Sequence, residues 1–305
     1  MKKVFSVVLI LLTIYMVGSI KPLEVHADMG PKASVTVEFE NLNNDVYVTL
    51  LANKEYFGPA HVYDEEYYGS IDEAWQIHKN IISKENFEKF INYEDVDGYF
   101  FLQQVWSITK DNNTLRWGYY PPGEFKILVL YPNEGKFASS DKQERYAFNS
   151  FFTVDMKDFS VANDQEVDPL PKIVKSYDYF GEIMGMVFRI ILTLLVELTL
   201  AIFFFSKKSK IFKIIVIINV ITQVILNVVL NIVYYYNGGL SYLLVYIPLE
   251  LLVILIEALT YIIIFKSSKE EIAKPVFKAI SYALIANIAS FGLGIVLAMY
   301  LPFGF

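Results

Sequence analysis

The chain has 305 residues, of which 54% are hydrophobic, and its formal net charge is −7. A mean hydropathy of +0.38 is too high for an ordinary soluble protein and predicts membrane-spanning segments. The absence of cysteine excludes disulfides, thiolate zinc sites and thiol redox chemistry. The 27 acidic and 14 basic residues between positions 28 and 182 disfavour nucleic acid as a partner.

The N-terminus has the order of a secretory signal peptide. Lys2 and Lys3 precede about 17 mostly apolar residues, and Ala27 supplies a small residue before Asp28. We therefore predict a signal peptide over 1–27, with an uncleaved signal anchor as the alternative. Both alternatives place the following segment on the outer side of the cytoplasmic membrane.

Residues 28–160 have the pattern of an exported β-rich domain. The alternating segment SVTVEF and strand-like segments such as EFKILVLY are separated by the turn-like clusters NLNN, PPG and PNEG. The acidic segment 70–95 predicts one or two helices, because Ser70 and Glu73 have the spacing of a capping box. The predicted fold class is therefore α+β: a β-sandwich-like domain with a helical insertion, followed by a transmembrane bundle.

The exported domain offers little chemistry. Asp95 and Asp97 resemble half of a calcium loop, but the first and last ligands are missing, which favours a helix-to-strand turn. For His61 and His78, solvated roles are favoured over metal binding. The acidic run 64–66 favours an exposed loop over a site for a cation or a carbohydrate. We predict no catalytic, metal or cofactor site here.

Residues 161–181 are polar and contain proline, which predicts a linker and an interfacial segment. Four apolar runs follow within 182–305, near 184–205, 212–234, 242–265 and 279–300. Each has about 22 residues, or about 33 Å as a helix, which is enough to cross a bilayer. The sequence therefore predicts a four-helix transmembrane bundle.

The loops between these runs predict the topology. Lysines crowd the segments 206–213 and 266–278, whereas the intervening YYNGGLS at 235–241 has no charge. Because cytoplasmic loops carry an excess of lysine and arginine, both lysine-rich segments are predicted to be cytoplasmic. We thus predict a multi-pass protein of the bacterial cytoplasmic membrane, with the N-terminal domain and the C-terminus outside the cytoplasm.

Polar side chains recur in every predicted span. The predicted intramembrane cluster consists of Arg189, Thr193, Glu197, Asn219, Thr222, Gln223, Asn227, Asn231, Glu250, Glu257, Asn287 and Ser290. Counting about 1.5 Å per residue from each span centre divides its central members into two layers. We name them the outer layer (Arg189, Asn227 and Glu250) and the inner layer (Glu197, Gln223, Glu257 and Asn287).

These layers lead to specific expectations. Arg189 is expected to pair with Glu250, while Glu197 and Glu257 are expected to meet amides. Two carboxylates with no cation beside them are not expected to be ionised together, which predicts a shared proton or a bound cation. In the last span, Ala286, Ser290, Gly294 and Ala298 form a row of small residues that predicts a homo-oligomer.

Five segments resemble an uncharacterised bacterial family of membrane proteins. They are DMGPKASVTVEF, RYAFNSFFTVDM, NVITQVILN, LELLVILIEALTY and ANIASFGLG. The resemblance implies a signal peptide, an exported N-terminal domain and four C-terminal transmembrane helices. It implies no activity.

Ionisable residues inside spans usually mark pathways or sites, whereas amides and hydroxyls alone commonly join helices. We therefore expect a small transport or ion- or proton-conducting module in the lipid bilayer. The alternatives are a purely structural bundle and an envelope sensor or assembly factor whose exported domain binds a small ligand or an envelope protein. An intramembrane enzyme is disfavoured, because no predicted span contains histidine, cysteine or aspartate.

Overall fold

The computed structural model describes residues 30–161, 167–205, 209–267 and 274–300, so the predicted signal peptide lies outside the described residues. The elements below all belong to one compact unit, Lys32–Phe305. The strands are β1 (Ser34–Glu40), β2 (Val46–Ala52), β3 (Tyr56–Phe57), β4 (Ala60–His61), β5 (Phe100–Phe101), β6 (Trp106–Ile108), β7 (Thr114–Trp117), β8 (Glu124–Tyr131), β9 (Lys136–Ser139), β10 (Gln143–Glu144), β11 (Asn149–Asp155), β12 (Val167–Pro169) and β13 (Ile173–Lys175). The helices are α2 (Glu65–Tyr68), α3 (Ile71–Gln76), α4 (Lys84–Ile91), α5 (Tyr179–Phe205), α6 (Ser209–Ser267) and α7 (Pro275–Tyr300).

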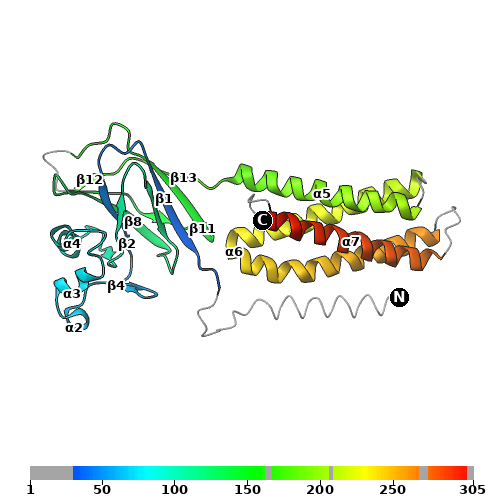
Figure 1. Ribbon diagram of the computed structural model, residues 1–305, viewed down its shortest axis with the longest axis horizontal. Coiled ribbons are helices and arrows are strands. Elements are labelled where there is room, and N and C mark those ends of the chain that lie inside the picture. The colour runs from blue at the N-terminus through cyan, green and yellow to red at the C-terminus, as the bar shows by residue number, and fades with distance from the viewer. Residues whose placement is uncertain (1–29, 162–166, 206–208, 268–273, 301–305) are drawn as a thin grey trace. The chain divides into compact units, whose positions relative to one another are not determined.

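The strands form two mixed sheets and a small hairpin of β3 and β4 (Figure 1). The four-stranded sheet has the order β13-β11-β1-β7, and the seven-stranded sheet has the order β12-β9-β8-β2-β5, with β10 beside β8 and β6 beside β2. Burial alternates along β11, where Phe152 and Val154 are buried and Phe151 is exposed. Side chains of both sheets share one core, in which the rings of Phe125 and Phe152 lie 5.4 Å apart. This region is therefore sheet-rich, as predicted.

The predicted helical insertion over 70–95 is present as α3 and α4, whereas the acidic run 64–66, predicted to be an exposed loop, caps and begins the short helix α2. Ser70 caps α3 by accepting a hydrogen bond from the backbone N–H of Glu73 at 3.3 Å, and Ser83 caps α4 in the same way. Phe87 and Phe90 of α4 are fully buried against Leu128 of the seven-stranded sheet. The helices therefore cover one face of that sheet.

The predicted linker over 161–181 contains two strands in the structure. Residues 167–169 pair in parallel with β9, and residues 173–175 pair antiparallel with β11. Both are short edge strands that bury few side chains, so they lack the apolar alternation by which a strand is found in a sequence. The sheet-rich region therefore extends beyond residue 160.

Three helices within the described residues are long and apolar enough to cross a membrane: α5, residues 210–267 of α6, and residues 275–293 of α7. The predicted bundle of four separate helices is not confirmed, because the second and third predicted spans both belong to α6. This element bends at Gly238, whose φ of 78° and ψ of −179° suit glycine alone. We call residues 209–237 and 239–267 the two arms of α6.

The two arms of α6 fold back on each other. Thr222 of the first arm lies 2.7 Å from Glu257 of the second, measured between the hydroxyl and a carboxylate oxygen. Figure 1 shows both arms running beside α5 and α7. A straight helix of 59 residues would measure about 88 Å, nearly three times the hydrocarbon thickness of a bilayer.

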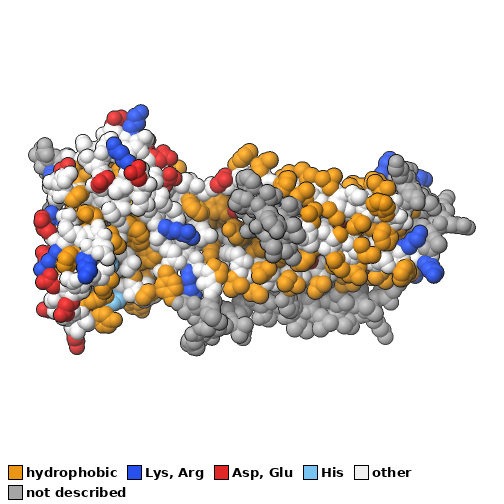
Figure 2. Space-filling view, viewed as in Figure 1, with side chains coloured by type: hydrophobic (Ala, Val, Ile, Leu, Met, Phe, Trp, Pro, Cys, Tyr) orange, Lys and Arg blue, Asp and Glu red, His pale blue; other side chains and the backbone are white. Residues whose placement is uncertain are grey.

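The helices present apolar side chains outward, as Figure 2 shows by their orange surface. Exposed side chains on them include Ile191, Ile225 and Leu251, which are 50–62% accessible. Lysines gather where α6 begins and ends and where α7 begins; the described ones are Lys210, Lys213, Lys266, Lys274 and Lys278. We call this the lysine end of the bundle, and the opposite end the Gly238 end.

Candidate intramembrane polar site

Glu257 lies in the second arm of α6 and is 1% exposed. Its Oε1 accepts a hydrogen bond from the Thr222 hydroxyl, and its Oε2 accepts one from the Asn287 amide of α7, both at 2.7 Å. Both carboxylate oxygens therefore have donors, from two different helical segments. This is the arrangement that a buried carboxylate requires in a medium without water.

Glu197 of α5 is fully buried, but its carboxylate is bonded less completely. Its Oε1 accepts from the Gln223 amide and from the Ser290 hydroxyl, both at 3.4 Å. Its Oε2 has no hydrogen-bond partner among the described residues. The two inner carboxylates thus differ: Glu257 has two short bonds, whereas Glu197 has two long bonds on one oxygen.

Asn219 ties the first arm of α6 to two buried tyrosines. Its Oδ1 accepts a hydrogen bond from the Tyr261 hydroxyl, and its amide donates to the Tyr282 hydroxyl at 3.4 Å. The Tyr282 hydroxyl donates in turn to the backbone carbonyl of Glu197 at 3.0 Å. Hydrogen bonds therefore connect all three helices at the level of the inner layer.

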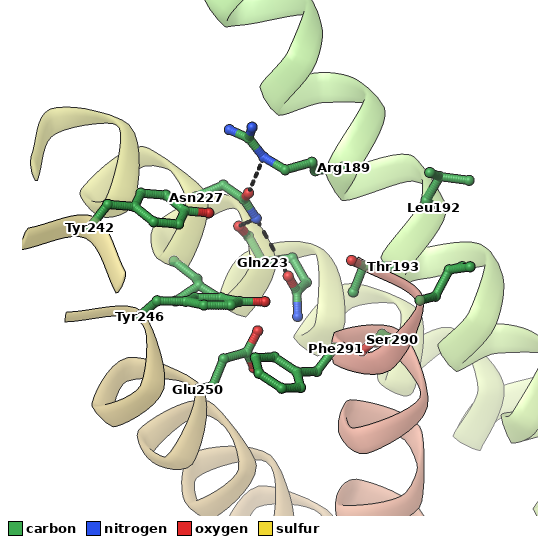
Figure 3. A pocket seen from close by; sticks show the side chains of 12 residues that line it. Arg189, Leu192, Thr193, Gln223, Asn227, Tyr242, Tyr246, Glu250, Ser290 and Phe291 are labelled. Carbon is green, nitrogen blue, oxygen red and sulfur yellow. Dashed lines mark hydrogen bonds between the residues drawn. The ribbon is translucent and has the colours of Figure 1, made fainter. Parts of the chain in front are cut away.

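On the Gly238 side of the inner layer lies a cavity of about 50 Å³. The polar side chains that line it are Arg189, Thr193, Gln223, Asn227, Tyr242, Tyr246, Glu250 and Ser290. A space of about 10–15 Å³ holds one water molecule, so this cavity has room for a few. In Figure 3 the Glu250 carboxylate, the Tyr246 hydroxyl and the Gln223 amide point toward one another.

Arg189 brings a cation to this cavity. Its guanidinium donates to Asn231 Oδ1 at 2.8 Å and to Asn227 Oδ1 at 3.4 Å, as Figure 3 shows for Asn227. Asn227 in turn donates to the backbone carbonyl of Gln223 at 2.9 Å. Arg189 and Glu250 line the same cavity, and an ion pair between them stays a prediction.

Gln223 and Ser290 join the two layers, because each lines the cavity and each donates to Glu197. Toward the lysine end the bundle becomes apolar. Six apolar members of one buried cluster pack there, all at most 5% exposed: Ala201, Phe205, Ile211, Ile215, Phe265 and Ala279. We call this the apolar cluster. The described polar groups therefore run from the cavity to the carboxylates and end about one helical turn beyond them, at Asn219, Tyr261 and Tyr282.

The predicted cluster omitted the tyrosines, although four of them take part. Tyr242 and Tyr246 line the cavity, while Tyr261 and Tyr282 bond to Asn219. Helical spacing carried a signal for Tyr282, because positions 282, 286 and 290 share one face of α7. Buried tyrosine needs a hydrogen-bond partner, so a tyrosine on a polar helix face belongs to the polar set.

The row of small residues in α7 is used inside the chain over its described part. Ala286 is 1% exposed and Ser290 is 7% exposed, and Ala286 packs in the same buried cluster as Tyr282. The side chains of Gly294 and Ala298 lie outside the described ones. A homo-oligomer through this row stays a prediction.

In the sheet-rich region, Asp95 forms the turn that was predicted there. Its Oδ2 accepts from the backbone N–H groups of Asp97 and Tyr99, and Lys126 donates to both Asp95 oxygens at 2.9 and 3.0 Å. Burial alone would lower the pKa of Lys126, but its hydrogen bonds to Asp97 and Asp95 outweigh burial and raise that pKa. Together with its hydrogen bond to Glu124, burial raises the pKa of Tyr99 to about 12.

The two histidines within the described residues are held by protein groups. His61 contacts the Val62 carbonyl and the Tyr68 hydroxyl, and His78 stacks on Phe87 with 5.2 Å between ring centroids. Within the described part of the chain, no group of three His, Asp or Glu side chains could hold a metal ion. A groove of about 420 Å³ lies beside Asp95, with walls made mainly of tyrosine and phenylalanine.

No family model, curated protein or solved structure matches this chain. The geometry of the polar site therefore carries the functional argument.

Proposed function

We propose that this protein is a small membrane module that moves a proton or a small cation through the polar core of its helical bundle. The observation that carries the proposal is the link from the cavity to buried Glu197 through Gln223 and Ser290. A second buried carboxylate, Glu257, lies in the same layer. Intramembrane ionisable groups that face a bundle interior usually mark ion pathways or proton relays. A purely structural bundle needs neither carboxylates nor a polar cavity.

In this proposal each arm of α6 crosses the bilayer, so that α5, both arms and α7 make four spans. Each arm, 209–237 and 239–267, has enough residues to exceed the roughly 20 that one crossing requires. The excess of lysine at one end supports a cytoplasmic location for the lysine end. The cavity would then face the outside of a bacterial cytoplasmic membrane, on the same side as a sandwich-like exported domain.

The test is proton flux in proteoliposomes that contain a trapped pH-sensitive dye and carry a potassium diffusion potential. Wild-type protein should acidify or alkalinise the lumen with the sign of the applied potential. Glu197→Gln and Glu257→Gln should abolish the signal, because each removes a carboxylate from the path. Glu182→Gln is the matched control, since Glu182 lies in the first turn of α5, away from the cavity lining. Flux that survives both core substitutions would overturn the proposal.

A second candidate function is ligand sensing by the exported domain, which the groove beside Asp95 favours. Its volume of about 420 Å³ falls within the range of small-molecule sites. Tyr63, Tyr93 and Tyr99 line it together with Glu94 and Asp95. Aromatic faces beside the exposed Glu94 carboxylate suit a saccharide or an organic cation. Titration with neutral oligosaccharides and with quaternary ammonium compounds tests this, and binding that Tyr63→Ala leaves unchanged would exclude the groove.

A further inference from the structure

The inner layer has more hydrogen-bond acceptors than donors. Among the described buried side chains, only four polar atoms lack a partner, and two of them lie in this layer: Glu197 Oε2 and Asn287 Oδ1. Both atoms are acceptors, and their side chains are at most 1% exposed. Because buried acceptors without donors are rare in native proteins, this pair indicates that the layer accommodates an additional donor.

The hydrogen bonds around the two carboxylates show which one would take a proton. Glu257 accepts two short bonds, one on each oxygen, as its ionised form requires. Glu197 accepts two long bonds on Oε1 and none on Oε2. A proton on Oε2 would convert this unpaired acceptor into a donor, and Asn287 Oδ1 is an acceptor of the same layer that still lacks one.

The charged and titratable groups on every packed helix agree with one bound proton. On α5 the nearest is Arg189, two helical turns away at the cavity, where it bonds to asparagines. The first arm of α6 faces Glu197 with amides, and the second arm supplies Glu250, Glu257 and Tyr261. On α7 the titratable group is Tyr282. Two buried carboxylates without an adjacent cation do not ionise together.

A metal ion fits the layer less well than a proton. A metal ion needs several oxygen ligands around a space of its own. The cavity of about 50 Å³ is lined by Ser290 and Gln223, and Glu197, Glu257 and Asn287 do not line it. A proton needs no additional space.

Ser290 supplies the connection from the cavity to Glu197. Its hydroxyl lines the cavity and lies 3.4 Å from Glu197 Oε1. A hydroxyl both donates and accepts, so it can take a proton from a cavity water while it passes its own proton on. Gln223 makes the same two contacts, but its amide nitrogen only donates and does not exchange a proton in this way.

We infer that Glu197 is a proton-binding site that is loaded from the cavity through the Ser290 hydroxyl, with Glu257 as its anionic partner. In the loading step, a hydronium ion in the cavity gives a proton to Ser290 Oγ and becomes water. The Ser290 O–H bond breaks as an O–H bond forms on Glu197 Oε1, so the charge of that carboxylate falls from −1 to 0. A half-turn of the carboxyl group then exchanges its two oxygens and places the proton at the position that Oε2 occupies in the structure. This inference rests on the proposed function and names the transported ion as a proton.

The test is infrared difference spectroscopy of the full chain in lipid nanodiscs, between acid and alkaline buffer and with no gradient present. A protonated carboxyl group gives a C=O stretch that is resolved from carboxylate bands. The band should be present in wild type and absent in Glu197→Gln, and it should remain in Glu257→Gln. A band that persists in Glu197→Gln, or that sodium removes from wild type at constant pH, would overturn the inference.

Time-resolved spectra after a pH jump test the relay and do not require that Glu197→Gln folds. Ser290→Ala should slow the appearance of the band by about 100-fold, the lower range for the loss of a positioned proton-transfer group. Ser290→Thr, which keeps a hydroxyl, should restore the rate. Thr199→Val is the control, because the Thr199 hydroxyl donates to its own helix at Leu195 and is exposed. Equal rates in Ser290→Ala and wild type would overturn the relay.

The spectra and the flux assay separate the two proposals. Loss of the band in Glu197→Gln without any flux in wild type would overturn transport alone. Flux in wild type with a band that does not depend on Glu197 would overturn the proton site alone.

Discussion

Two threonines of α6 allow the contribution of one interhelical hydrogen bond to be measured. Both back-bond to the carbonyl four residues earlier: Thr222 to Ile218 at 3.1 Å and Thr260 to Ile256 at 2.6 Å. Only Thr222 also reaches another segment, where its hydroxyl lies 2.7 Å from Glu257 Oε1. Thr222→Val and Thr260→Val therefore remove the same atoms from the same helix. Thr222 differs by its bond to Glu257 and by a second bond within its own helix, to the Asn219 carbonyl at 3.2 Å.

The expected difference follows from that geometry. Interhelical hydrogen bonds in membranes average about 0.6 kcal/mol and reach about 1.7 kcal/mol. A bond to a charged acceptor contributes about 1.5–3 kcal/mol in soluble proteins. Because Glu257 keeps its bond from Asn287, we expect Thr222→Val to cost about 1–2 kcal/mol more than Thr260→Val.

The assay is reversible unfolding in mixed micelles with increasing SDS, followed by helical circular dichroism. The free energy of unfolding is compared for wild type, each variant, and Thr222→Val combined with Glu257→Gln. Thr222→Val should lower the free energy of unfolding less when residue 257 is already glutamine, because the acceptor of the Thr222 hydroxyl has then lost its charge. Equal losses in the two threonine variants, to within about 0.5 kcal/mol, would refute the assignment of Thr222 to the carboxylate layer.

Three further predictions concern stability. Lys126→Met should lower the free energy of unfolding by about 3–5 kcal/mol, because it leaves the buried Asp95 carboxylate unpaired. Lys142→Met, which breaks an exposed pair, should lower it far less, and thermal unfolding compares the two variants. The pKa of Tyr99 is about 12 in the folded protein and about 10 in an unfolded chain, so the stability that its neutral hydroxyl contributes is lost as the pH rises from about 10 to about 12. Tyr99→Phe should therefore make the melting temperature depend less on pH across that range. Gly238→Ala should lower the free energy of unfolding by about 1–3 kcal/mol, because alanine is strained at the positive φ of this position. Gly239→Ala, at a position without positive φ, should lower it less in the same SDS titration.

The sequence predicted the polar faces of the bundle well, because polarity at helical spacing is a local property. Glu197, Glu257 and Asn287 are all at most 1% exposed, as side chains turned away from lipid would be. The helical insertion was predicted for the same reason, since Ser70 and Glu73 act within one turn.

The partners of those residues were harder to predict. Which donor meets which carboxylate depends on the rotation and depth of each helix, and these are set by packing between segments far apart in the chain. Arg189 shows this: its bonds to Asn231 and Asn227 follow from the depth of α5 against the first arm of α6. The strands at 167–169 and 173–175 escaped prediction because pairing, rather than burial, defines them.

The apolar cluster at the lysine end has an electrical consequence. A polar cavity brings a medium of high dielectric constant close to the carboxylates, so little of a transmembrane voltage would fall across the Gly238 side of the bundle. Most of the voltage would fall across the apolar cluster, which contains Phe205 and Phe265. One elementary charge that crosses the full voltage gains about 2.3 kcal/mol per 100 mV. The proton occupancy of Glu197 would then follow the pH on the cavity side. Voltage would act on the later step, in which a charge passes the apolar cluster.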